Sequence, residues 1–234
     1  MLSSAKSGGW TEIAALARRS EPAPTDLRFR ALVGGAAWSG LPARVRARFS
    51  RRMAAGSAVT YVGEVTESRR NLVGALIAQA CRVIGAPLPL DDEVGAAAVV
   101  TVTEDVATGD QFWTRMYGRR RGFPQVIQSS KRFAGPTGLE EYLGAGFGIA
   151  LSVSVDDRAL CFRSHHYFLA LAGWRLRLPA WLAPGALTIS HIDRGGGWFA
   201  FVLALRHPLF GEVVHQTGLF REHVAPDQEE PCHD

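Results

Sequence analysis

From Leu90 onward, apolar and polar residues alternate along the chain, and short turns rather than helix-length segments separate the alternating stretches. Successive side chains of a β-strand point to opposite faces of a sheet, so alternation with a period of two predicts strands. One strand is predicted upstream, at residues 57–66. The strands predicted after Leu90 lie at residues 97–106, 111–117, 123–133, 147–155, 160–171, 186–192, 198–207 and 212–221.

The gaps between these strands are rich in residues that tolerate tight turns. Examples are Thr108-Gly109-Asp110, Asp156-Asp157 and the segment 193–197. Such short turns join antiparallel strands, whereas parallel strands need a long crossover. A sheet of this size also tends to curl. We therefore expect a large, curved, mainly antiparallel sheet of about 8–9 strands, arranged as a meander that approaches a half-barrel.

The strongest helical signal lies at residues 69–84. Apolar residues recur there at intervals of three and four, which places them on one stripe of a helix. Ser68 precedes the segment as a capping residue, and Gly85 followed by Pro87 ends it. The residues of the stripe are Leu72, Val73, Leu76, Ile77, Ala80, Val83 and Ile84. We expect this helix to bury its stripe against the sheet.

Two shorter helices are predicted near the N-terminus. One runs from Asp26 toward Trp38, and the other begins at Pro42 and ends near Phe49, because proline is well tolerated in the first turn of a helix. The expected fold class is thus α+β, with the long helix and the short N-terminal helices packed on the curved sheet.

Composition favours one folded domain. Apolar residues make up 47% of the chain and charged residues 21%, which is ample for a hydrophobic core. We expect a flexible leader at residues 1–24, a single α+β domain at 25–224 and a disordered acidic tail at 225–234. No stretch has the roughly 18 consecutive apolar residues of a membrane span, and no secretory signal is recognised. The expected protein is cytoplasmic and not integral to a membrane.

Neither the charge nor the motifs point to a nucleic acid or a cofactor. The formal net charge is +4, but the arginines are spread along the chain instead of clustering with aromatic residues. No strand is followed by a Gly-x-Gly-x-x-Gly turn and a helix, the pattern of a dinucleotide site. We expect no specific nucleic-acid partner and no cofactor.

The histidines do not have the spacing of a metal site. His207, His215 and His223 are eight residues apart, whereas a compact zinc site has ligands two to four residues apart. His165 and His166 are adjacent on a predicted strand, so they point to opposite faces unless a bulge intervenes. We expect no bound metal.

Three polar residues are candidates for chemistry. His191 and Asp193 share one face of a predicted strand, where they can act as a general base and its orienting carboxylate. Asp193 also begins a glycine-rich turn, in which aspartate is common for local reasons. Glu141 is a carboxylate inside a half-buried sheet and therefore needs a cationic partner. The available cations are Arg115, Arg132 and Arg175. Glu141 fits either a structural ion pair or a ligand-binding role.

The C-terminal half also carries an ordered set of short motifs. They are Gly138-Leu139-Glu140-Glu141, Gly173-Trp174-Arg175, Leu178-Pro179, Trp198-Phe199-Ala200-Phe201 and Pro208-Leu209-Phe210-Gly211. With similar segments upstream, they resemble the bacterial family catalogued as domain of unknown function 4166, over about residues 27–222. Some relatives look like C-terminal extensions of saccharopine-dehydrogenase-like proteins, so the resemblance implies a separate oxidoreductase as a partner. It implies no catalytic residues.

Three functional hypotheses remain. In the first, the chain is a non-enzymatic binding module that holds an apolar or amphipathic, lipid-like small molecule inside the curved sheet. Its expected ligand-binding residues are Trp113, Arg115, Glu141, Phe168, Trp174 and Arg175. In the second, the chain is an enzyme, or an accessory of a separate NAD(P)-dependent oxidoreductase, with His191, Asp193 or Glu141 as acid–base groups. In the third, the apolar second face of residues 198–205 is a homodimer surface. The sequence leaves the oligomeric state open.

Overall fold

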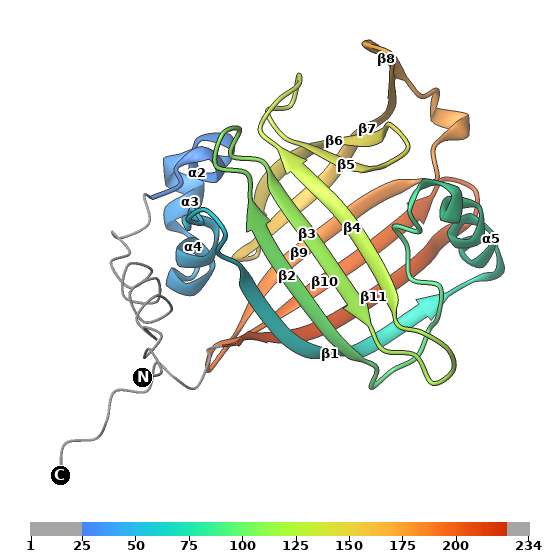
Figure 1. Ribbon diagram of the computed structural model, residues 1–234, viewed down its shortest axis with the longest axis horizontal. Helices are drawn as coiled ribbons and strands as arrows, with labels where there is room; N and C mark the ends of the chain where they lie inside the picture. Colours follow the sequence, from blue (N-terminus) through green and yellow to red (C-terminus); the bar gives the residue numbers. More distant parts are fainter. Residues whose placement is uncertain (1–24, 224–234) are drawn as a thin grey trace, which may run out of the picture.

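A computed structural model of the chain describes residues 25–223, so the predicted leader and tail lie outside the described residues (Figure 1). The helices are α2 (Arg28–Val33), α3 (Gly35–Ser39), α4 (Ala43–Phe49) and α5 (Leu72–Ala80), with the 3₁₀ turns η1 (Cys81–Ile84) and η2 (Ala180–Leu182). The strands are β1 (Val59–Arg70), β2 (Ala97–Glu104), β3 (Gln111–Tyr117), β4 (Gln125–Arg132), β5 (Glu140–Gly144), β6 (Phe147–Asp156), β7 (Ala159–Leu171), β8 (Trp174–Arg177), β9 (Ala186–Gly195), β10 (Trp198–His207) and β11 (Gly211–Glu222).

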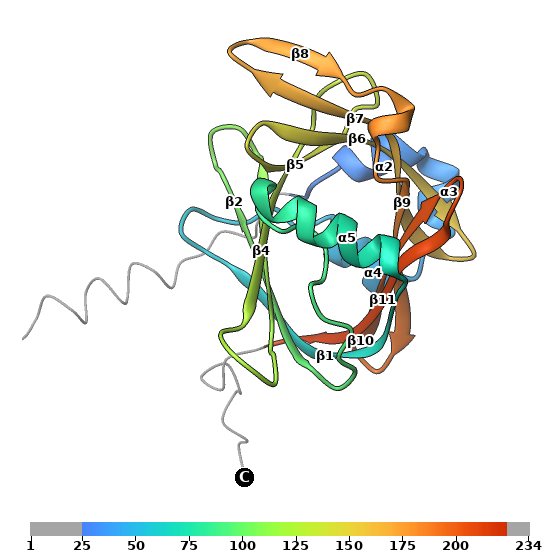
Figure 2. The same cartoon turned by 90° about the vertical axis from the view of Figure 1, so that its right-hand side faces the viewer.

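The sheet closes on itself. Neighbouring strands pair antiparallel in the order β6-β5-β4-β3-β2-β1-β11-β10-β9-β7, and β6 also pairs with β7. These strands form a closed 10-strand barrel (Figure 2). Strands make up 51% of the structure and helices 17%. The predicted α+β class with an open half-barrel is therefore wrong, because the fold is mostly β and the sheet is a complete ring.

Strand β7 closes the ring because it pairs with β6 along one edge and with β9 along the other. Its first edge runs along β6, from Ala159 to Leu169. On its second edge, residues 160–163 pair with β9, whereas residues 168–171 pair with β8. Strand β8 therefore extends the sheet outside the barrel wall. Closure leaves no open edge within the ring, and the alternation of residues does not reveal it because every strand of a large sheet has the same period.

Helices α2, α3 and α4 lie at one end of the barrel, and α5 lies at the other (Figure 1). Phe29 of α2 and Phe49 of α4 are buried with ring centroids 5.2 Å apart, and Phe29 lies 6.0 Å from the ring of Phe162 on β7. Trp38 of α3 joins the same core cluster. Helix α4 begins at Ala43, one residue later than predicted, and Pro42 is its N-cap, where proline costs no helical hydrogen bond. These aromatic side chains fill that end of the barrel.

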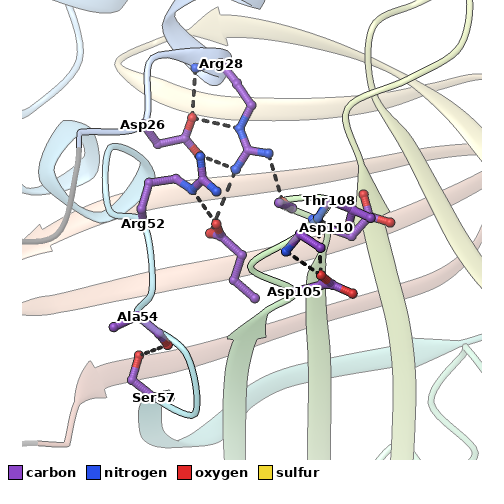
Figure 3. A network of polar contacts seen from close by, with 11 residues as sticks. Asp26, Arg28, Arg52, Ala54, Ser57, Asp105, Thr108 and Asp110 are labelled. Atoms are coloured by element: carbon purple, nitrogen blue, oxygen red, sulfur yellow. Dashed lines mark hydrogen bonds and ion pairs between the residues drawn. The ribbon is translucent and has the colours of Figure 1, made fainter. Parts of the chain in front are cut away.

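A polar network fastens the start of the described chain to the β2–β3 turn (Figure 3). The buried carboxylate of Asp26 accepts hydrogen bonds from the backbone N–H, Nε and Nη2 of Arg28 at 2.8–2.9 Å. Nη1 of Arg28 donates to the carbonyl of Gly109 at 2.8 Å, and Arg52 pairs with the buried carboxylate of Glu104. The network holds segments that are far apart in the sequence against one end of the barrel.

Helix α5 is shorter than the sequence predicts. Its expected start at residue 69, capped by Ser68, is wrong because β1 continues through Arg70 in pairing with β11. Asn71 caps the helix instead, since its side-chain oxygen accepts a hydrogen bond from the Gly74 N–H at 2.9 Å. The helix tightens into η1, and Gly85, in the left-handed conformation, ends it as predicted.

The predicted stripe of α5 is only partly buried. Leu72 is 78% exposed and Val83 is 83% exposed, whereas Val73 and Ile77 pack toward the core. Gly74 permits the close approach of α5 to β11, because a Cβ at this position would lie 1.9 Å from the carbonyl oxygen of Val213. The helix thus sits across the end of the barrel, with apolar side chains on both its inner and outer sides.

Candidate functional site

The barrel encloses a cavity of about 650 Å³ beneath α5. Both α5 and η1 contribute to its wall, and the rest comes from inward-facing residues of the strands and from the segment after η2. Apolar side chains dominate the lining, including those of Ile77, Ile127, Ile149, Leu187, Phe201 and Leu203. A volume of this size and an apolar lining are typical of sites for small organic molecules.

Exposed apolar residues surround this end of the barrel. They include Leu76 on the outer side of α5, Trp181 and Leu182 on η2, and Phe210 in the β10–β11 turn. The Asn71 side chain donates to the carbonyl of Phe210 at 3.2 Å, which places that turn beside the start of α5. Clustered exposed apolar side chains of this kind often mark a ligand-binding or interaction surface.

One wall of the cavity carries a buried charged cluster. Nη2 of Arg115 donates to Oε1 of Glu141 at 3.2 Å, and the Ser129 hydroxyl donates to the same oxygen at 2.6 Å. Nη1 of Arg115 donates to the Ser129 oxygen at 3.1 Å. The Lys131 ammonium lies 3.0 Å from Oε2 of Glu141 and forms an ion pair with it. Arg115 and Glu141 both line the cavity.

The cluster shifts the pKa values of its members. Burial by itself raises the pKa of Glu141, but Lys131 and Arg115 outweigh burial and hold that pKa at about 2. Burial lowers the pKa of Lys131, and the neighbouring Arg115 lowers it further, while Glu141 opposes both effects. Glu141 is therefore ionised at neutral pH. The charged form of Lys131, by contrast, is disfavoured by burial and by Arg115 and is favoured by Glu141.

Two neutral polar side chains also face the cavity. Gln216 on β11 is only 8% exposed, and no hydrogen bond joins its side-chain amide to another residue in the described part of the chain. The hydroxyl of Tyr117 on β3 also faces the cavity and also makes no hydrogen bond to another residue in the described part of the chain, and burial raises its pKa. Sequence reasoning missed both residues. For Gln216 the available signal was its position on β11, where alternation places its side chain on the same face as that of Val214.

The barrel interior continues past Arg115 toward the N-terminal helices. A smaller void of about 20 Å³ shares Arg115, Tyr117 and Phe201 with the main cavity and is also lined by Trp113 and His191. Trp113 lies beside the charged cluster, since its ring is 5.0 Å from the Lys131 ammonium and 5.8 Å from the Arg115 guanidinium. The structure thus brings Trp113, Arg115 and Glu141 together.

His191 lies in this deeper region with Arg48 rather than with Asp193. Nη1 of Arg48 donates to Nε2 of His191 at 2.6 Å, and the imidazole stacks on Phe199 with centroids 4.4 Å apart. Burial, and secondarily Arg48, lowers the pKa of His191 well below its usual value, so the ring is neutral. Asp193 accepts from the Gly195 N–H at 3.4 Å, and within residues 25–223 no hydrogen bond joins it to His191. The predicted base–carboxylate pair is not assembled.

The other predicted ligand-binding residues lie outside the cavity. Trp174 is 75% exposed at the β7–β8 turn. Arg175 forms two contacts with the Glu140 carboxylate, one of them a 2.9 Å hydrogen bond from Nη1, and its guanidinium lies 3.7 Å from the ring centroid of Phe168. Glu140 and Glu141 are adjacent on β5, so they point to opposite faces. Arg175 therefore pairs on the outer side of the wall and Arg115 on the inner side.

Replacing Arg175 with methionine is expected to destabilise the β7–β8 hairpin by about 1–3 kcal/mol, because it leaves the carboxylate of Glu140, which is 0% exposed, without its cation. Hydrogen exchange of the β8 amides and the midpoint of urea unfolding measure the effect. Arg177→Met is the control, since Arg177 lies on the same strand and forms no ion pair with a described residue. Equal exchange in the two variants would contradict a structural role for Arg175.

A β-bulge brings His165 and His166 together on the surface. The register between β6 and β7 shifts at Ala150, so Leu151 faces Ser164 and His165 has no opposite residue. The two Nδ1 atoms lie 2.9 Å apart. The sequence predicts opposite faces for these histidines unless a bulge intervenes, and this bulge is that exception. Burial, followed by Arg177, lowers the pKa of His166, an environment unsuited to a cation.

Across residues 25–223, no group of three or more His, Cys, Asp and Glu side chains is arranged to hold a metal ion. In the same part of the chain, no helix is both long and apolar enough to cross a membrane.

Comparison with known proteins gives one match. A family model described as "Domain of unknown function (DUF4166)" matches residues 41–220. No curated protein and no solved structure matches the chain. The matched segment runs from Leu41, the residue before Pro42, to Phe220, and so includes the barrel strands except for the last two residues of β11.

Proposed function

The chain belongs to the DUF4166 family, whose description assigns no function, and we propose that this member is a non-enzymatic binding protein for an apolar or amphipathic small molecule held inside the barrel. The observation that carries the proposal is the apolar cavity of about 650 Å³, with a charged cluster on one wall. Burying a charged side chain in an apolar cavity costs free energy unless the charge pairs with another charged group or binds a ligand.

The two parts of the cavity suit the two parts of an amphipathic ligand. The side chains of α5, β9 and β10 offer an apolar surface on which a hydrocarbon tail is desolvated, at about 25 cal/mol per Å² of buried apolar area. The polar side chains of Arg115, Tyr117 and Gln216 face the same space and can fix the position of a polar head group. Exposed apolar residues near α5 give the ligand an apolar route to the interior.

The alternative of an enzyme, or of an accessory to an NAD(P)-dependent oxidoreductase, has less support. His191 has its Nε2 engaged by Arg48, and Asp193 is not joined to it. Glu141 is held as an anion by two cations, which makes it a poor proton donor at neutral pH. A partner oxidoreductase rests on the family resemblance alone.

Titration with the neutral fluorescent compound N-phenyl-1-naphthylamine tests the proposal. We expect saturable binding to one site per chain, with an increase in fluorescence as the dye leaves water. A ligand that binds only the folded state adds about 2.7 kcal/mol of stability at a concentration of about 100 times its Kd, so the dye should also raise the melting temperature. Native mass spectrometry of gently purified protein checks for a co-purified small molecule.

The proposal fails under a clear combination of results. If the dye shows no saturable binding, the melting temperature does not change and the native mass is that of the chain alone, the cavity is not a binding site for such molecules.

A further inference from the structure

The charges that line the interior do not cancel. The buried cluster contains two cations, Arg115 and Lys131, and one anion, Glu141, so its formal charge is +1 when all three are ionised. Deeper in the barrel, Arg48 is hydrogen-bonded to a neutral imidazole, and no described carboxylate forms an ion pair with it. The interior is therefore short of negative charge.

Arg115 retains hydrogen-bonding capacity toward the cavity. A guanidinium has five N–H donors, and those of Arg115 make one hydrogen bond to Ser129 and one to Glu141. The amide of Gln216 and the hydroxyl of Tyr117 add donors that have no partner among residues 25–223. A polar side chain as well buried as Gln216 normally has a hydrogen-bond partner. These side chains come from β3 and β11, on different parts of the barrel wall.

We infer that the natural ligand is an amphipathic anion with a singly charged head group, a carboxylate, which binds at Arg115 with its apolar tail in the cavity beneath α5. The inference rests on the proposed binding function and narrows it to one ligand class. A single negative charge balances the +1 cluster, and its two oxygens can accept hydrogen bonds from Arg115 and from Gln216. A neutral head group leaves the excess charge uncompensated, and a cationic head group increases it.

Three ligands with the same tail and different head groups test the inference. Dodecanoate, dodecanol and dodecylammonium each compete with bound N-phenyl-1-naphthylamine, at a pH where the acid is ionised and below their micelle concentrations. We expect dodecanoate to bind about tenfold more tightly than dodecanol or better, the factor of a charged hydrogen bond, and dodecylammonium to bind most weakly. Equal affinities of dodecanoate and dodecanol would overturn the inference while leaving the binding function intact, whereas the absence of all binding would reject both.

Variants locate the head group. Arg115→Met should remove the preference for dodecanoate over dodecanol without weakening dodecanol, because only the carboxylate depends on the guanidinium. Arg121→Met is the matched control, since Arg121 is exposed in the β3–β4 turn and should leave both affinities unchanged. If Arg115→Met does not fold, Gln216→Leu serves instead and should weaken dodecanoate several-fold more than dodecanol. A full preference for dodecanoate in Arg115→Met, or in Gln216→Leu if that variant replaces it, would place the head group elsewhere and contradict the assignment.

Discussion

Replacing Glu141 with glutamine is expected to lower the free energy of unfolding by about 3–5 kcal/mol. The substitution keeps the size of the side chain but leaves Arg115 and Lys131 as two buried cations without an anion. Removing one member of a buried ion pair is costly because the remaining charge stays desolvated. Urea unfolding followed by far-ultraviolet circular dichroism measures the loss. Removing one cation as well, in Glu141→Gln/Lys131→Met, should recover part of it.

The matched control is Glu93→Gln, because Glu93 pairs with Arg120 at the surface. Surface ion pairs contribute about 0–1 kcal/mol, so this variant should unfold almost as the wild type does. A loss of less than about 1 kcal/mol in Glu141→Gln would show that the buried cluster does not depend on its carboxylate.

The free energy of unfolding at acid pH should also depend on Glu141. The pKa of Glu141 in the folded protein is about 2, below its ordinary value of 4.5. A lowered pKa means that the unfolded chain binds the proton more readily, so this part of the stability is fully present above the ordinary pKa and is lost as the pH falls toward about 2. The stability of Glu141→Gln should therefore decrease less steeply with acid than that of the wild type.

Replacing Leu203 with tryptophan should abolish most ligand binding. Leu203 lies on β10 and faces the cavity, so the larger indole occupies space that a ligand tail needs. Displacing three to four methylene groups costs about 3 kcal/mol at about 0.8 kcal/mol each, which is roughly a hundredfold in affinity. Titration with N-phenyl-1-naphthylamine measures the change, and urea unfolding confirms that the variant is folded.

Val202→Trp is the control for this substitution. Val202 is the adjacent residue on β10, and alternation along the strand turns its side chain to the outer face of the barrel. This variant adds the same indole outside the cavity and should bind the dye as the wild type does. Unchanged binding in Leu203→Trp, or equal losses in both variants, would contradict a binding site inside the barrel.

Much of the strand pattern could be predicted from the sequence. Strands β3 and β10 have the predicted bounds, and β2, β6 and β9 begin at the predicted residues. Alternation and turn residues are local signals, and in these strands the local preference agrees with the final pairing. Strands β5 and β8 were missed because they have five and four residues, too few for a period to stand out.

The candidate site was only partly predictable. A carboxylate in a half-buried sheet needs a cation, and this rule identified Glu141 and included Arg115 among its partners. It could not choose between Arg115 and Arg175, because the choice depends on which face of β5 each arginine meets. The rule also gave no reason to single out Lys131, which pairs with Glu141 because the two residues are opposite each other in the register of β4 and β5. Gln216 carried no chemical signal of its own.

The sequence by itself determined most of the antiparallel strands, their turns, the helical character of the N-terminal segment and the family, because each of these depends on residues close together in the chain or on the order of short motifs. Only the tertiary structure decided that β6 meets β7, that β1 continues through Arg70 and that α5 lies across the end of a closed barrel. Those features depend on pairing between distant segments, whose free energy overrides local preference. The cavity belongs to this second group, because its walls exist only once the ring has closed.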